Sequence, residues 1–216
     1  MGIEFVVAII ILIFSAILHE IMHGVAANKL GDPTARLMGR LTLNPLPHID
    51  PIMSVILPIS LYFLSGGQVI FAAAKPVPVN PIHFKDPRRD MALVALAGPL
   101  TNFAIAIIAA LLIHPLLLMG GESQSYLVGF TYFVLLSIVR INLFLGFLNL
   151  LPIPPLDGSK VFSIVLPSDM AATYLSIERY GIFILFFLLS FPIAGFSIGD
   201  FLGHLVNTSM DLLIRM

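Results

Sequence analysis

Long stretches of this sequence are apolar without the regular alternation of polar positions that marks a water-facing helix or strand. Such runs cover residues 3–27, 91–119, 126–151 and 174–198. All four are longer than the roughly 20 residues that a helix needs to cross the hydrocarbon core of a bilayer. The pattern therefore predicts four long transmembrane helices.

A fifth apolar run, residues 51–74, is interrupted by Pro58 and by the turn-forming segment Ser65–Gln68. Its short halves favour a re-entrant hairpin, and a full span is the alternative. The polar segments on either side carry most of the cations: Lys29, Arg36, Arg40, Lys75, Lys85, Arg88 and Arg89. Because cations accumulate on the cytoplasmic side of membrane proteins, we expect both segments there and the N-terminus outside.

Two shorter patterns complete the predicted fold. Residues 36–43 end in an apolar–polar–apolar alternation that suggests a short strand. The tail from Asp200 to Met216 mixes apolar and polar positions and is expected to form an amphipathic helix at the membrane surface. We therefore predict an all-α polytopic membrane protein, with four long helices, a re-entrant segment and an amphipathic C-terminal helix, in a single domain over residues 1–216.

Composition supports lipid as the surrounding medium. The chain is 58% hydrophobic and 11% charged, with a mean hydropathy of +1.02, whereas soluble domains have about 25% charged residues. A net charge of -1 and the lack of a basic arm argue against nucleic acid as a partner. The sequence has no cysteine, which excludes disulfides and thiolate ligands, so a metal would need His, Asp or Glu.

The first apolar run contains the pattern His-Glu-x-x-His at His19, Glu20 and His23. Positions i and i+4 share one face of a helix, so both imidazoles can reach one zinc ion, and Glu20 can act as general base on a water beside it. Ionisable groups inside a membrane helix are costly and are rarely present without a function. The alternative is a pair of buried histidines hydrogen-bonded to neighbouring helices.

Catalytic zinc usually has three protein ligands, and Asp157 is the best further candidate. It follows the proline-rich residues 152–155, which cannot continue a helix, and it precedes Gly158, which permits a sharp return of the chain. Non-helical backbone at membrane depth is tolerated where it lines a protein cavity. The alternative for Asp157 is an N-cap of a helix that begins near Ser159.

Residues 39–51 and 74–79 resemble the compact prokaryotic subgroup of the site-2 protease family of intramembrane zinc proteases. Three motifs resemble this family as a whole. They are His-Glu-x-x-His, Ala97-Gly98-Pro99 with Asn102, and the segment from Asn149 through Pro152, Pro154 and Pro155 to Asp157-Gly158. The resemblance implies one Zn²⁺ per chain, held by His19, His23 and Asp157, with Glu20 as base. Asn102 is expected to pack helices, with Gly98 allowing their close approach.

The resemblance also implies a role for Asn149 near the metal, either polarising the scissile carbonyl or orienting the substrate. An interhelical hydrogen bond is the alternative for this side chain. The expected substrates are single-pass membrane proteins in a prokaryotic cell membrane, held as an extended strand along residues 36–43 or 69–79, with the active site toward the cytoplasm. The alternative function is a zinc-binding transporter or non-proteolytic scaffold, and nothing in the sequence indicates the oligomeric state.

Overall fold

The protein was analysed as a computed structural model that describes residues 2–50, 56, 60, 74–119, 126–192 and 195–215. Within these ranges the chain is helical and contains no β-strand. The α-helices are α1 (Ile3–Leu30), α2 (Thr34–Leu37), α4 (Pro87–Met119), α5 (Tyr126–Leu150), α6 (Asp157–Phe162), α7 (Ser168–Ser176), α8 (Gly181–Ser190) and α9 (Ile198–Arg215). Short 3-10 helices are η1 (Leu46–His48), η3 (Pro81–His83), η4 (Ser163–Val165) and η5 (Ile177–Tyr180).

Four helical stretches of the described residues are long and apolar enough to cross a bilayer: Ile3–Leu30, Pro87–Leu116, Tyr126–Leu150 and Ser168–Leu189. Their outward faces carry large apolar side chains, such as Ile10, Leu111 and Leu127, that are well exposed. Such faces are stable against hydrocarbon and not against water. The predicted all-α polytopic membrane fold is therefore confirmed.

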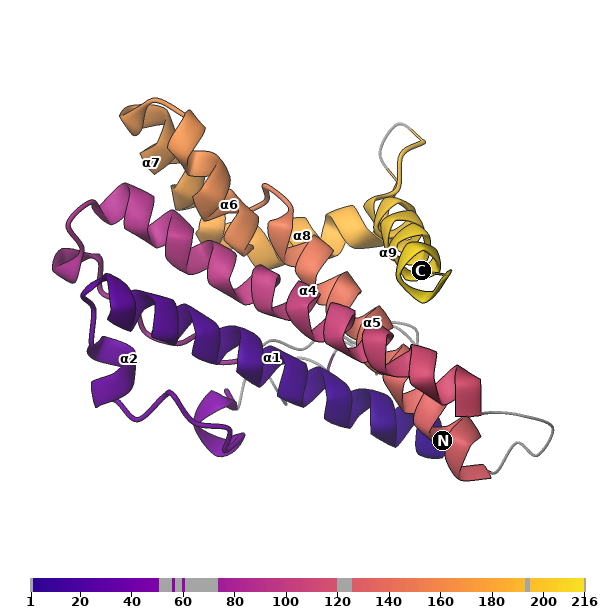
Figure 1. Ribbon diagram of the computed structural model, residues 1–216. Coiled ribbons are helices and arrows are strands. Elements are labelled where there is room, and N and C mark those ends of the chain that lie inside the picture. The colour runs from indigo at the N-terminus through magenta and orange to yellow at the C-terminus, as the bar shows by residue number, and fades with distance from the viewer. Residues whose placement is uncertain are drawn as a thin grey trace.

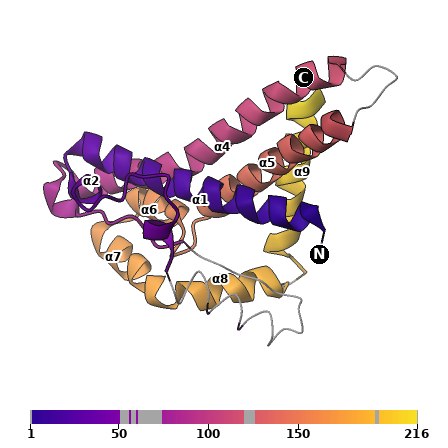
Figure 2. The same ribbon diagram turned by 90° about the horizontal axis from the view of Figure 1, so that it is seen from below.

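Helix α4 lies at the centre of the molecule and packs against both α1 and α5 (Figure 1). The chain runs along α1 in one direction and returns along α4, so the end of α1 lies beside the start of α4 (Figures 1 and 2). Small side chains of α4, including Ala106 and Ala110, form a buried cluster with Val139 and Leu143 of α5. Small residues let membrane helices approach closely.

The predicted strand over residues 36–43 is wrong. Residues 34–37 form the single turn α2, and a turn through Gly39, whose φ is 66°, follows it. Thr34 donates its backbone N–H to the Asp32 carboxylate, which starts the helical turn. The alternation at Leu41–Leu43 covers too few residues to form a strand without a neighbouring strand, and the described chain places none beside it.

The fourth apolar run differs from its predicted bounds of 174–198. The helical stretch begins at Ser168 and passes through α7, η5 and α8 to Ser190. The chain leaves the helix at Phe191, just before Pro192, because a residue before proline is disfavoured in helical conformation. The predicted hairpin over 51–74 lies outside the described residues, apart from Ile56, Ser60 and Ala74.

The C-terminal helix α9 is amphipathic, as predicted, but part of its apolar face is covered by protein. Leu202 and Val206 are buried, and Val206 belongs to the cluster formed with α4 and α5. The His114 side chain of α4 also donates from Nε2 to the Leu213 carbonyl, 3.3 Å away. The apolar face that we expected to lie in the membrane surface therefore packs against the transmembrane helices, beside α5 in Figure 2.

Candidate metal centre

Helix α1 places His19 and His23 one turn apart on the face that meets α4, and their Nε2 atoms lie 3.0 Å apart. Both side chains are buried, with 7% and 8% of their residue surface exposed. The helix continues without interruption to Leu30 and ends at Gly31, which has the left-handed φ of 114° that favours glycine. The two imidazoles therefore share one face of α1, and their role as zinc ligands stays a prediction.

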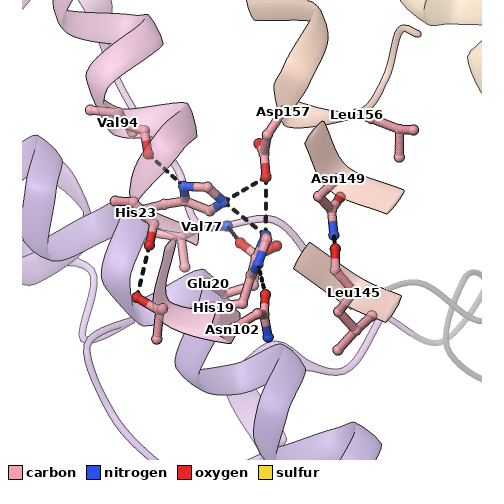
Figure 3. A network of polar contacts seen from close by, with 12 residues as sticks. His19, Glu20, His23, Val77, Val94, Asn102, Leu145, Asn149, Leu156 and Asp157 are labelled. Carbon is pink, nitrogen blue, oxygen red and sulfur yellow. Dashed lines mark hydrogen bonds and ion pairs between the residues drawn. The ribbon is translucent and has the colours of Figure 1, made fainter. Parts of the chain in front are cut away.

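Asp157 reaches the same point from the other side of the molecule. After α5 ends at Leu150, the proline-rich segment turns the chain back, and α6 begins with Asp157 as its first residue. Asp157 Oδ2 lies 3.1 Å from Nε2 of both histidines (Figure 3). The alternative role of Asp157 as an N-cap is wrong, because Leu156 occupies the N-cap position.

Gly158 is needed for close approach rather than for an unusual backbone conformation. A Cβ atom at this position would lie 2.2 Å from the Leu150 carbonyl oxygen, which belongs to the end of α5. Any side chain would therefore push α6 away from α5 and move Asp157 away from the histidines. This close packing explains in physical terms why a glycine follows the aspartate.

The hydrogen bonds of the two imidazoles determine which nitrogens are free. His23 Nδ1 lies 2.7 Å from the Val94 backbone carbonyl, which can only accept, so this nitrogen carries the proton. His19 Nδ1 lies 2.6 Å from Asn102 Oδ1, another acceptor. In the neutral imidazoles both Nε2 atoms then direct lone pairs toward Asp157 Oδ2. Three lone pairs that converge in this way repel one another unless a cation lies among them.

The donor set fits zinc. The three ligand atoms of His19, His23 and Asp157 lie within 4.8 Å of one another, and their individual separations are 3.0–3.1 Å. Tetrahedral zinc with bonds of about 2.0–2.1 Å separates its ligand atoms by roughly 3.3 Å. Two imidazoles and one carboxylate also match the ligand types of catalytic zinc sites. These residues form the one such group found in the described part of the chain.

Glu20 is half-buried beside the histidines, and its Oε2 accepts a hydrogen bond from the Val77 backbone N–H at 2.8 Å (Figure 3). Val77 lies in residues 74–80, a segment without helix or strand that leads into η3. The buried Arg40 side chain donates to the Lys75 and Pro76 carbonyls at 2.8 and 3.2 Å. The Glu20 carboxylate is thus oriented by a segment that is itself held by Arg40.

The other end of this segment is held by Asp32, which is fully buried just after α1. Its carboxylate accepts from the Asn80 backbone N–H at 2.7 Å and from His83 Nδ1 at 2.9 Å. Burial raises the pKa of Asp32, but the hydrogen bonds from Thr34, Asn80 and His83 outweigh it and leave the pKa below its ordinary value. Asp32 is therefore ionised at neutral pH, and its support of the segment weakens only as the pH falls through that lowered pKa.

Asn149 lies in the last turn of α5, and its Nδ2 donates to the Leu145 carbonyl of the same helix at 3.0 Å (Figure 3). Its predicted role in catalysis stays a prediction. Gly98 does allow the predicted close approach, since a Cβ there would lie 2.5 Å from His23 Nε2. The contact of Asn102 with His19 was not predicted, and neither was the hydrogen bond from Asn102 Nδ2 to Asn142 Oδ1 of α5. Partners so distant in sequence leave no local pattern.

Comparison with known proteins agrees with this geometry. The family model described as "Peptidase family M50" matches residues 7–120 and 114–191. The chain belongs to peptidase family M50. This family comprises the site-2 proteases, so the resemblance seen in the sequence motifs is confirmed. No solved structure matches the chain.

Three relatives of this M50 chain are each described as a putative zinc metalloprotease. "Putative zinc metalloprotease YwhC" of Bacillus subtilis (strain 168) is 35% identical over 211 residues, which cover 96% of this chain and 89% of the relative. "Putative zinc metalloprotease MJ0611" of Methanocaldococcus jannaschii is 33% identical, over 73% of this chain and 69% of the relative. "Putative zinc metalloprotease Rip2" of Mycolicibacterium smegmatis is 27% identical over 83% and 65%. The M50 chain is a multi-pass membrane zinc metalloprotease.

Proposed function

We propose that this enzyme hydrolyses peptide bonds within or near the transmembrane segments of single-pass membrane proteins. The observation that carries the proposal is the convergence of His19, His23 and Asp157 on one point between α1 and α6, among helices that are long and apolar enough to span the membrane. A metalloprotease for soluble substrates has no need to bury its ligands in such helices, where polar groups are costly.

His19 Nε2, His23 Nε2 and Asp157 Oδ2 would hold the zinc, which when bound would polarise the scissile carbonyl and lower the pKa of an attacking water. Glu20 would take a proton from the attacking water and deliver it to the leaving amine. The hydrogen bond from Val77 N–H keeps the Glu20 carboxylate turned in a fixed direction, as a general base requires.

We propose that Asn149 assists by donating its side-chain amide to the oxygen of the scissile carbonyl, where negative charge develops. Its position at the end of α5, close before the segment that carries Asp157, supports this role. The Nδ2 group donates to Leu145 in the described conformation, so the side chain has to turn toward the substrate when one binds. The hydrogen bond to the Leu145 carbonyl can be given up at a small cost in free energy, because that carbonyl belongs to the same helix.

The substrate has to unwind locally, because a helix keeps its carbonyls in hydrogen bonds and the ligands are buried. The described part of the expected docking strand, residues 74–79, limits how the unwound chain can bind. Pro76 and Pro78 have no N–H, and the Val77 N–H is donated to Glu20. Arg40 already donates to the Lys75 and Pro76 carbonyls, so a substrate strand would donate chiefly to the carbonyls after them and would not receive a full ladder of hydrogen bonds.

The function can be tested with purified enzyme in proteoliposomes that also contain a single-pass substrate. Two versions of the substrate differ only in whether the transmembrane helix contains a Gly-Pro pair or two alanines. We expect cleavage in the transmembrane region, mapped by mass spectrometry, to be faster for the Gly-Pro version, to stop after zinc is chelated, and to return with zinc. Tight zinc binding without cleavage of any membrane protein would instead favour a transporter or scaffold.

The active site is proposed to face the cytoplasm. His19 and His23 lie in the C-terminal half of α1, which ends beside the start of α4 (Figure 1). Lys29 lies in the last turn of α1, and Arg36 and Arg40 follow the helix. Because the natural chain has no cysteine, Arg88→Cys introduces a unique thiol near that end. In intact cells this thiol should resist a membrane-impermeant maleimide until the membrane is opened. Rapid labelling of intact cells would reverse the proposed orientation.

A further inference from the structure

Two buried asparagines connect the metal centre to helix α5. Asn102 of α4 and Asn142 of α5 are both completely buried, and Ser15 of α1 beside them is nearly so. Asn102 Nδ2 donates to Asn142 Oδ1 at 2.9 Å. Asn142 Nδ2 donates to Ser15 Oγ and to the Ile138 carbonyl, both at 2.9 Å. With the contact of Asn102 Oδ1 to His19 Nδ1, these bonds form one continuous chain.

The chain of hydrogen bonds has only one consistent direction. The Ile138 carbonyl belongs to the backbone of α5 and can only accept, so Asn142 must turn its NH₂ group toward it. Asn142 Oδ1 then faces Asn102 and can only accept, so Asn102 must present its NH₂ group there. This leaves Asn102 Oδ1 toward His19, and an acceptor at that place requires a proton on His19 Nδ1.

We infer that Asn102 and Asn142 are positioning residues that hold His19 in its metal-binding tautomer by transmitting the polarity of the Ile138 carbonyl. With the proton on Nδ1, the lone pair of Nε2 is available at the point where Asp157 and His23 converge. In the opposite tautomer an Nε2–H would donate to Asp157 and occupy the place of the metal. This inference rests on the metal site of the proposed function and adds residues that contact no reacting atom.

Simple helix packing does not account for this arrangement. Two buried amides can hold helices together in either orientation, and apolar side chains would do so without the need to satisfy polar atoms. Here every hydrogen bond of the two side chains agrees with the single direction that ends in an acceptor at His19. His23 reaches the same tautomer by a shorter route, through the Val94 carbonyl of α4.

The experiment compares zinc affinity, measured by competition with a chromogenic chelator, with the visible spectrum of the cobalt-substituted protein. Asn102→Leu and Asn142→Leu are each expected to weaken zinc binding about 10- to 100-fold, as loss of a partner behind a metal-bound histidine does. They should also alter the cobalt spectrum. Asn102→Asp keeps an acceptor for His19 and, as a buried carboxylic acid, can donate its O–H to Asn142 Oδ1, so it should retain much more of the affinity than Asn102→Leu does.

Two control variants test whether zinc affinity depends on the orientation of the asparagine hydrogen bonds or on helix packing in general. Thr101→Val removes a hydroxyl next to Asn102 that donates only within α4, to the Ala97 carbonyl, and should leave zinc affinity and spectrum unchanged. Ser15→Ala should also have little effect, since the Ile138 carbonyl still sets the orientation of Asn142. Should leucine at 142 prevent folding, Asn142→Ala makes the same test without added bulk.

The outcomes distinguish this inference from the proposed function. If His19→Ala keeps full zinc affinity, the proposed metal site itself is wrong. If His19→Ala loses zinc while folded Asn102→Leu and Asn142→Leu bind zinc and cobalt as the natural protein does, the metal site stands and the positioning role is overturned. Equal losses in Asn102→Asp and Asn102→Leu would overturn it too, because the acceptor would then not matter.

Discussion

Glu20→Gln is expected to keep zinc bound while cleavage falls by about 10²- to 10⁴-fold, the range that a general base contributes. Glutamine has nearly the same shape and can still accept the Val77 N–H through its amide oxygen. It cannot take a proton from water at neutral pH. The measurement pairs zinc content per chain with the initial rate of substrate cleavage in proteoliposomes.

The matching control for this prediction is His23→Ala, which removes a proposed ligand and should lose both zinc and cleavage. The two variants together separate metal binding from proton transfer. A Glu20→Gln enzyme that cleaved at the natural rate would show that another group is the base. In that event the hydrogen bond between Glu20 and Val77 would be part of the support of α1 rather than of the chemistry.

Gly98→Ala should abolish stoichiometric zinc binding and cleavage, although it adds a single methyl group. The new Cβ would lie 2.5 Å from His23 Nε2 and 2.6 Å from His19 Nε2, well inside van der Waals contact. Both nitrogens are proposed ligand atoms, and their rings are tied by Nδ1 to Val94 and Asn102, so they cannot retreat without breaking those bonds. Zinc content and cleavage rate are the quantities to measure.

Gly129→Ala is the control, because Gly129 lies in the spanning helix α5 and a methyl group added there would meet nothing within 4 Å. It tests the general effect of adding a methyl group to a membrane helix and should leave zinc content unchanged. Full zinc content and activity in Gly98→Ala would contradict the close approach of α4 to the histidines. It would also weaken the geometric basis of the metal centre.

The residues whose arrangement was predictable from sequence are those that are close neighbours along the chain. His19, Glu20 and His23 follow from helical periodicity alone, because α1 is unbroken around them. The long apolar runs identify membrane helices for the same reason, since length and hydropathy do not depend on partners. Asp157 was predictable only as the acidic residue that follows a break in the helix, and its approach to the histidines requires the packing of α6 on α4.

The features that could not be predicted depend on distant partners. Asn102 was expected to pack helices, and its contact with His19 joins positions 83 residues apart. The short strand was inferred from three alternating residues, whereas the hydrogen bonds of the Asp32 carboxylate and of the Arg40 side chain determine the local structure. The apolar face of α9 could equally have met lipid, and only the complementary surface of α4 and α5 decides that it meets protein.

The segment of alternating prolines beside Glu20 has a consequence for conformational entropy. Pro76, Pro78 and Pro81 each fix one backbone angle and also restrict the residue before them, so the unfolded segment already has few conformations to lose. A small number of contacts, from Arg40, Asp32 and Glu20, is then enough to hold it in place. The free-energy cost of ordering the segment that contacts the proposed base is met once, when the chain folds, and does not recur in each catalytic cycle.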